Sequence, residues 1–374
     1  MLLKPLLRHA FLLLAALLAG RSTAQHGTPD HGGDHAGPAA AEAHAGAPAA
    51  KFNAGDLIMG HVGDEHGWHL WGHTSLPLPV ILYNSERGLS VFSSARFDHG
   101  HRTYGGYALH EGMVVAVNAP DGTDAHQAVV DQRLTEATLD LSITKNVATM
   151  IVVSALLLWV FISVARAYGR RAGQAPTGLQ NLVEPIILFV RDDVAKSAIG
   201  HKYEKYLPYL LTAFFFIFFG NLLGLVPFFP GGANLTGNIA VTGVLALITF
   251  IIVTVNGNRH YWQHIFAMPG VPGWVLAILT PVEVLGMFLK PFVLMIRLFA
   301  NITAGHIIAL SFYSLIFVFG ETSAGAGYGV AIGSWAFTVF MFMLELLVAF
   351  IQAYVFTFLS AMYIGAAVEE PHHH

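Results

Sequence analysis

Long apolar segments constrain this sequence more than any other feature. Residues 147–165 and 207–229 are runs of 19 and 23 residues without a charged side chain, and residues 239–255 form a third run. Two further stretches, 284–319 and 330–364, exceed the ~20 residues that an upright helix needs to cross a bilayer. We therefore expect an all-α membrane protein with five transmembrane helices, of which the last two are long and tilted.

Composition supports this class and excludes several others. Charged residues make up 11% of the chain, far below the roughly 25% of an ordinary soluble domain. The absence of cysteine excludes disulfides and cysteine-ligated metals, and a net charge of −4 argues against a nucleic-acid partner. No GxxxxGK[ST] phosphate loop occurs in the sequence. We therefore expect no cofactor and no phosphate-loop nucleotide site in this chain.

The N-terminal third of the chain has a different character from the rest. Residues 1–24 combine Lys4 and Arg8 with a short apolar run and small residues, which is typical of a cleaved signal peptide; the alternative is an uncleaved anchor helix. The histidine-, alanine- and glycine-rich segment 25–50 cannot bury a core and is expected to be disordered. Residues 51–143 are expected to form a small exported domain of mixed or β character.

Short strands are predicted within this exported domain at 79–83, 89–92 and 113–118. His66, His69 and His73 have the i, i+3, i+7 spacing of one helix face and could hold a metal. No carboxylate–histidine motif accompanies them. A polar, mildly pH-responsive surface is therefore the favoured reading.

Basic residues predict how the chain is oriented in the membrane. Seven Lys and Arg residues lie between the first two spans, whereas the loops 230–238 and 320–329 contain none. The positive-inside rule then places the N-terminal domain in the periplasm and the C-terminus in the cytoplasm of a bacterial inner membrane. Within the basic segment, apolar residues from Leu179 to Val190 recur with helical spacing, which predicts an amphipathic helix on the cytoplasmic membrane surface. The membrane domain as a whole is expected to cover 144–370.

Ionisable residues interrupt only the last two spans. Each such residue costs about 2.5–3.5 kcal/mol on insertion scales and is a functional candidate by default. Glu283, Lys290 and Arg297 are seven residues apart, so they share one helix face, and Asn301 lies close to it. His306, nine residues after Arg297, points to the opposite side.

The final span contributes Glu345 and Gln352, which share one face of their helix. Arginine keeps its proton in proteins, whereas His306 and Glu345 can both gain and lose one. A fixed cation flanked by titratable groups suits a proton path. The alternative is a buried Arg–Glu pair that stabilises the bundle, with His306 as an ordinary core histidine.

The segment from Lys290 through Arg297 and Asn301 to His306 resembles the signature of subunit a of the F-type ATP synthase. Asn221 to Pro227, residues 235–250, and Glu345 through Gln352 to Tyr354 resemble further motifs of that family, in the same order. The amphipathic stretch 179–200 also fits. The similarity covers about 144–370, and the exported domain resembles only extended members of the family.

This resemblance implies a non-catalytic stator subunit that translocates protons through two aqueous half-channels. Arg297 would stand between the half-channels and face the rotating c-ring, and Asn301, Gln352 and Asn221 match polar residues of the family. His306 and Glu345 match a proton-access pair, although many members place the carboxylate on the fourth span and the histidine on the fifth. Glu283 and Lys290 would lie toward the cytoplasmic exit.

The implied partners are the c-ring, the peripheral stalk subunit b and the lipid membrane. Ala300 and Gly224 depart from the residues found in many members. A secondary ion or proton transporter is the alternative function, but five spans do not divide into two equal repeats. A bis-histidine haem protein would need paired histidines in the spans, where only His306 occurs.

Overall fold

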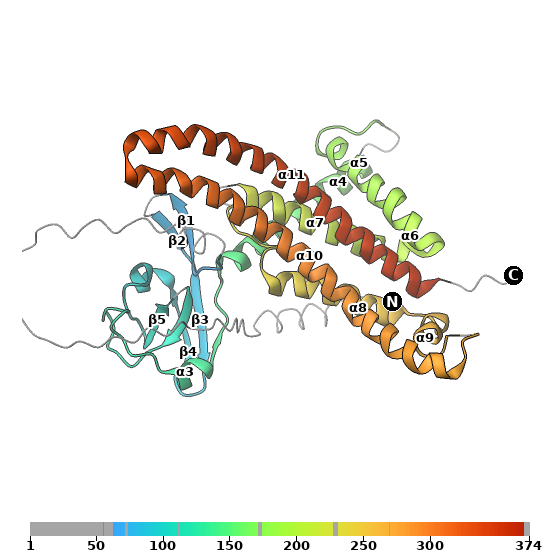
Figure 1. Cartoon of the computed structure of the whole chain (residues 1–374), viewed down its shortest axis with the longest axis horizontal. Helices are drawn as coiled ribbons and strands as arrows, with labels where there is room; N and C mark the ends of the chain where they lie inside the picture. The colour runs from blue at the N-terminus through green and yellow to red at the C-terminus, as the bar shows by residue number, and fades with distance from the viewer. Residues whose placement is uncertain are drawn as a thin grey trace, which may run out of the picture.

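The computed structural model describes residues 63–71, 74–110, 112–170, 174–226, 231–268 and 270–369, together with Gly55. The expected signal peptide at 1–24 and the histidine-rich segment at 25–50 lie outside these ranges. Figure 1 shows two parts, a small strand-containing domain and a bundle of long helices.

The N-terminal domain is built from short antiparallel strands: β1 (Gly67–Trp71), β2 (Thr74–Pro77), β3 (Pro79–Asn84), β4 (Gly88–Ser93), β5 (Tyr107–His110), β6 (Met113–Ala116) and β7 (Thr138–Asp140). β3, β4 and β6 coincide with the three predicted strands. The strands of the domain pair as a β1–β2 hairpin, a three-stranded sheet in the order β4-β3-β7, and a β5–β6 hairpin. The 3₁₀ segment η1 (Ser94–Gly100) and the short helix α3 (Gln132–Glu136) complete the domain.

The core of this domain lies between the three-stranded sheet and the layer of β5, β6 and α3. Val80 and Leu82 of β3 are fully buried and pack against Tyr107 of β5 and Leu134 of α3. Alternate residues of β3 and β4 point away from this core, as the two-residue period of a strand requires. One face of the sheet is therefore packed and the other is open.

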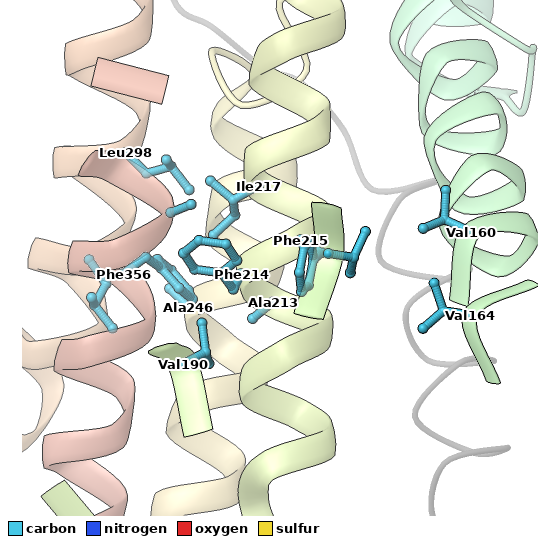
Figure 2. Packing of buried hydrophobic residues seen from close by; sticks show 13 residues of the cluster. Val160, Val164, Val190, Ala213, Phe214, Phe215, Ile217, Ala246, Leu298 and Phe356 are labelled. Carbon is cyan, nitrogen blue, oxygen red and sulfur yellow. The ribbon is translucent and has the colours of Figure 1, made fainter. Parts of the chain in front are cut away.

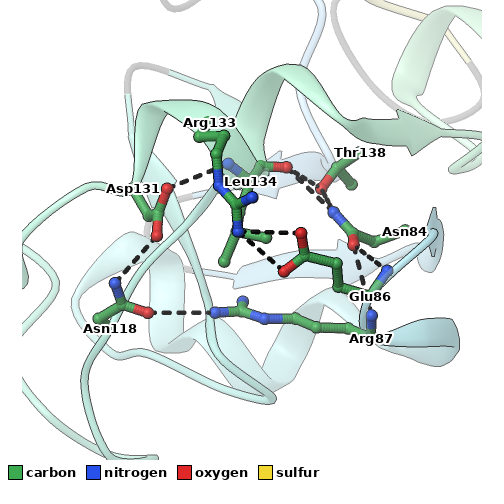
Figure 3. A network of polar contacts seen from close by, with 8 residues as sticks. All are labelled: Asn84, Glu86, Arg87, Asn118, Asp131, Arg133, Leu134 and Thr138. Carbon is green, nitrogen blue, oxygen red and sulfur yellow. Dashed lines mark hydrogen bonds and ion pairs between the residues drawn. The ribbon is translucent and has the colours of Figure 1, made fainter.

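A polar network fixes the β3–β4 turn to α3 (Figure 3). The Nδ2 of Asn84 donates to the carbonyl of Leu134 at 3.1 Å and to Thr138 Oγ1 at 2.8 Å. Its Oδ1 accepts from the backbone N–H of Glu86, whose carboxylate pairs with Arg133 at 2.9 Å. Because Asn84 is fully buried, these contacts fix the turn firmly against the rest of the domain.

The segment before β1 joins the domain to the first membrane helix. The carboxylate of Asp64 accepts from the backbone N–H of Asn146 at 3.1 Å and from Thr144 Oγ1 at 2.9 Å. It thereby caps the start of helix α4 (Lys145–Arg170).

His66, two residues further along, is buried between strands. Its Nε2 lies 3.1 Å from Asp140 Oδ2, and its Nδ1 lies 3.0 Å from the carbonyl of Gly112. Burial lowers the pKa of His66, but the hydrogen bond to Asp140 and the charge of that carboxylate outweigh it and leave the pKa raised. For Asp140 the effects have the opposite signs. Burial raises the pKa of this carboxyl, but its hydrogen bonds, the one from His66 foremost, and the charge of that histidine outweigh burial and leave the pKa below its usual value. The protonated histidine is therefore the form that the fold favours.

Within the described residues, five helices are long and apolar enough to cross a membrane, as the sequence predicted. They are α4, α7 (Tyr203–Leu225), α8 (Ile239–Asn256), α10 (Gly273–Thr322) and α11 (Ala324–Val368). α7 is shifted toward the N-terminus relative to the predicted 207–229. The last two are longer than the predicted 284–319 and 330–364.

The predicted amphipathic segment is helical. It comprises α5 (Leu179–Phe189), a π-helical stretch η2 (Val190–Lys196) and α6 (Ser197–Ile199), followed by the 3₁₀ turn η3 (Gly200–Lys202) before α7. Val183 and Val190 are buried against the bundle, while Leu182 is 67% exposed. The segment thus presents apolar groups both to the bundle and outward, as a helix lying at a membrane surface would.

The helices meet around a core of aromatic and small aliphatic side chains (Figure 2). Phe214 and Phe215 of α7 are buried, with Val160 of α4 on one side and Phe356 of α11 on the other. Leu298 of α10 closes the same cluster. Since lipid is as apolar as these side chains, close packing rather than the hydrophobic effect holds such helices together.

α10 and α11 form an antiparallel hairpin, the longest feature in Figure 1. Their 50 and 45 residues correspond to about 75 and 68 Å, more than twice the ~30 Å of a hydrocarbon core. Ser323 lies between them, and its side chain accepts from the N–H of Ala326 and caps α11. The hairpin therefore must either tilt strongly within the membrane or extend beyond it.

Candidate functional site

A cavity of about 150 Å³ lies where α7, α10 and α11 meet. Among its lining residues are four of the polar side chains that the sequence singled out: Asn221 of α7, Asn301 and His306 of α10, and Glu345 of α11. The volume is sufficient for several water molecules. The structure therefore brings together side chains that are up to 124 positions apart in the sequence (from 221 to 345).

Glu345 is the most buried ionisable group of this cavity, with 7% of its surface exposed. Neither of its carboxylate oxygens has a hydrogen-bond partner among the described residues. Its Oε1 packs against Gly305 so closely that a Cβ at that position would lie 2.9 Å from it. A residue without a side chain at 305 is thus what lets the carboxylate reach α10.

His306 follows Gly305 and is half-buried on the same part of α10. A Cβ on Gly224 of α7 would lie 3.9 Å from His306 Nε2. The imidazole therefore lies against Gly224 of α7. The expectation that His306 and Glu345 approach the same space from two helices agrees with this arrangement.

Asn221 connects three elements at the edge of the cavity. Its Oδ1 accepts from the hydroxyl of Thr236 in the loop between α7 and α8. Its Nδ2 donates to the carbonyl of Ala349, one turn after Glu345, at 3.5 Å. Asn221 thereby positions the turn of α11 that carries the carboxylate.

Arg297 lies outside this cavity, on an exposed face of α10. Within the described part of the chain, no hydrogen bond or ion pair reaches its guanidinium. The alternative of a buried Arg–Glu pair is therefore wrong, because the arginine is exposed and Glu345 is not its partner. Gln352 is buried on α11 and lines neither this cavity nor the one described next.

A second, smaller cavity of about 10 Å³ lies nearer the C-terminal end of α11. Lys290 lines it, and its Nζ is 5.6 Å from the ring centroid of Tyr363. Tyr261 of the short helix α9 (Arg259–Phe266) lines it too. Burial raises the pKa of Tyr261, and the negative charge of Glu283 raises it further, so Glu283 is close to this end of the site.

The histidine triplet predicted from helical spacing does not form a helix. His66 precedes β1 and His69 lies within that strand, so the i, i+3, i+7 pattern carries no common face. The side chain of His69 and all of His73 lie outside the described residues. Within those residues, no three His, Asp or Glu side chains gather as a metal site.

Sequence reasoning missed the contribution of the loop between α7 and α8. Asn234 and Thr236 of this loop are buried beside the cavity. The indole Nε1 of Trp68 in the N-terminal domain donates to the carbonyl of Gly231 at 2.9 Å. The polar run from Asn234 to Asn238 between two apolar spans was the available signal. The N-terminal domain and this loop thus lie on the same side of the bundle.

The fold and the site together define a class: a multi-pass helical membrane protein whose last two helices hold ionisable groups at membrane depth. The family described as the ATP synthase A chain matches residues 147–365. The chain belongs to this family. A second family, described as a domain of unknown function, matches residues 57–141.

Curated relatives agree with this membership. The chain is 45% identical to ATP synthase subunit a of Chloroherpeton thalassium over 240 residues, which is 63% of this chain and 69% of the relative. It is 48% identical over 246 residues to ATP synthase subunit a 2 of Chlorobaculum tepidum, covering 64% and 66% of the two chains. With ATP synthase subunit a of Myxococcus xanthus the identity is 44% over 252 residues, or 64% and 78% of the chains.

Proposed function

We propose that this chain is the stator subunit through which protons cross the membrane of an ATP synthase. Its relatives are named as subunit a of that enzyme. The chain has no phosphate-binding loop, so ATP chemistry belongs to other subunits and this chain is not itself catalytic. Its partners are then the rotating c-ring and the peripheral stalk subunit b, in a bacterial inner membrane.

The observation that carries this proposal is the exposed guanidinium of Arg297 in the middle of a membrane helix. An arginine at the centre of a span costs about 2.5–3.5 kcal/mol on insertion scales. The described part of the chain supplies no counter-charge to offset this cost. An ionised carboxylate on an adjacent subunit would, because an opposite charge within a few ångströms stabilises both groups.

The cavity around Glu345 and His306 would serve as the half-channel that delivers protons to this carboxylate. Once protonated, the carboxylate is neutral and can turn into lipid, which its ionised form cannot do cheaply. Asn301 is exposed on α10 and also lines the cavity, so it links the cavity to the face that carries Arg297. Because arginine does not give up its proton, Arg297 blocks a direct transfer between the two half-channels.

The second half-channel would follow Lys290 and Glu283 at the other end of α10. These two residues lie near Tyr261 and Tyr363. The basic segment between the first two spans is expected on the cytoplasmic side, and the N-terminal domain is expected in the periplasm. The hydrogen bond from Trp68 to Gly231 supports this orientation, because it joins two segments that are both expected outside.

Substitution of Arg297 tests the proposal. Arg297→Ala should abolish proton-driven ATP synthesis in membrane vesicles while the complex still assembles. Arg297→Lys should also fail, because an ammonium group that becomes buried against the ring can lose its proton. Arg259→Ala, which removes a cation outside the spans, is the matched control and should retain synthesis. Normal synthesis by Arg297→Ala would refute the proposed role.

An exchange of residues tests the proton-access cavity separately. His306→Ala and Glu345→Ala should each slow proton transport, whereas the double exchange with glutamate at 306 and histidine at 345 should restore much of it. If both alanine variants transport protons at the wild-type rate, the cavity is not the access path.

A further inference from the structure

The N-terminal domain carries an apolar face that the described residues leave exposed. Tyr83 of β3 is 48% exposed and Leu89 and Val91 of β4 are 65% and 62% exposed. Leu139 in β7 and Leu141 just after it are 48% and 46% exposed. We call these five residues the sheet face.

The strand register places these side chains side by side. Tyr83 pairs with Leu89 on one side and with Leu139 on the other, and Ile81 pairs with Val91. The backbone N–H of Leu141 donates to the carbonyl of Ile81, which extends the ladder past β7. The sheet face is therefore one contiguous patch of uncharged residues. Its exposed area is on the order of 500 Å², within the roughly 300–600 Å² of the largest apolar patch on a typical monomer, and such patches are often functional.

The sheet that carries this face continues into the first membrane helix. Ile143 still donates from its backbone N–H to the carbonyl of Pro79, and α4 begins at Lys145. The sheet is thus joined to the span without a flexible linker, and Asp64 caps the same helix start. In Figure 1, β3 and β4 lie on the side of the domain toward the helical bundle, with β5 on the far side.

The two faces of the sheet have different neighbours. In Figure 1, β3 and β4 run obliquely to the long helices α10 and α11. The packed side of the sheet faces β5, β6 and α3. Its open side is therefore turned away from β5, and in Figure 1 this is the side toward the helical bundle.

We propose that the sheet face rests on the outer surface of the same bilayer and inserts its side chains among the lipid headgroups. A tyrosine surrounded by leucine and valine, without charges, has the chemistry of the membrane interface. The polar network at Asn84 and the cap at Asp64 hold the sheet rigid at both ends of this contact. The domain is thereby fixed against the membrane.

Single cysteines test this contact, because the chain has none of its own. Leu89→Cys and Val91→Cys place a label on the sheet face. Val129→Cys is the matched control, since Val129 is apolar, 74% exposed, and lies beside the end of β6 in the layer away from the sheet. The full chain, with any subunits that co-purify, is labelled with an environment-sensitive fluorophore and placed in phosphatidylcholine vesicles.

Quenchers in the lipid and in water then distinguish the possible surroundings. Spin-labelled lipid should reduce the fluorescence at positions 89 and 91 about twofold and leave position 129 nearly unchanged, as insertion by ~5–10 Å requires. Iodide should quench only position 129. Equal quenching by iodide at all three positions would show an open face, and protection of 89 and 91 from both quenchers would show that protein covers it. Either result overturns the proposal.

Discussion

Replacing Gly305 with alanine separates the stability of α10 from the position of the Glu345 carboxylate. Alanine is favoured over glycine inside a helix by about 1 kcal/mol. The new Cβ would, however, lie 2.9 Å from Glu345 Oε1, and an ordinary contact needs about 3.4 Å or more. The carboxylate sits at the end of a flexible side chain, so it should move by about 0.5 Å without unfolding the bundle. Where a rate depends on geometry, a misplacement of about 1 Å can lower that rate on the order of 100-fold. The shift of the Glu345 carboxylate therefore predicts roughly a tenfold loss in the rate of proton transport.

The assay compares assembly and proton-driven ATP synthesis in the same vesicles. Gly286→Ala on α10 and Gly333→Ala on α11 are the controls, because a Cβ at either position meets nothing within 4 Å. Both controls should assemble and synthesise ATP at the wild-type rate. Gly305→Ala should also assemble but should synthesise ATP about tenfold more slowly, because protons pass more slowly. If Gly305→Ala conducts at the wild-type rate, the close approach of Gly305 to Glu345 has no part in the proton path.

Three further predictions concern stability. Because the pKa of His66 is raised in the folded state, its contribution to stability is complete below its ordinary pKa of about 6.5 and is lost as the pH rises through the raised value. Denaturation followed by tryptophan fluorescence should show this loss of stability, and His66→Gln should remove the pH dependence. Leu298→Ala should destabilise the helical core by about 2–5 kcal/mol, whereas Ile296→Ala, at a 37% exposed position, should cost under about 1 kcal/mol; equal losses in thermal unfolding would contradict the packing. Trp68→Phe should cost about 1 kcal/mol and speed hydrogen exchange around Gly231, and unchanged exchange would show that the indole does not hold this loop.

The sequence predicted the existence and order of the membrane helices better than their ends. Hydropathy placed the second span at 207–229, but α7 ends at Leu225 and apolar residues continue into the loop. It also began the fourth span at 284, eleven residues after the true start of α10 at Gly273. Apolar character reports burial in lipid or protein, whereas a helix continues for as long as its backbone hydrogen bonds do.

Helix periodicity predicted which ionisable residues share a face, and this was sufficient to place His306 away from Arg297. It could not show that Asn221 from another helix lines the cavity, or that Thr236 from a loop donates to Asn221, because those contacts depend on tertiary packing. At His66 and His69 the helical spacing indicates no common face, because His66 precedes strand β1 and His69 lies within it.

The central claim is that Arg297 faces a carboxylate on a rotating partner, and a disulfide cross-link tests it most directly. Ala300 is exposed one turn from Arg297, and the chain has no other cysteine, so Ala300→Cys offers a single reactive thiol. Paired with a cysteine beside the carboxylate of the ring subunit, it should cross-link under oxidation and stop ATP synthesis until a reductant is added. Leu158→Cys, on a 64% exposed position of α4, should form no such link. A ring that cross-links to position 158 and not to position 300 would contradict the proposed function.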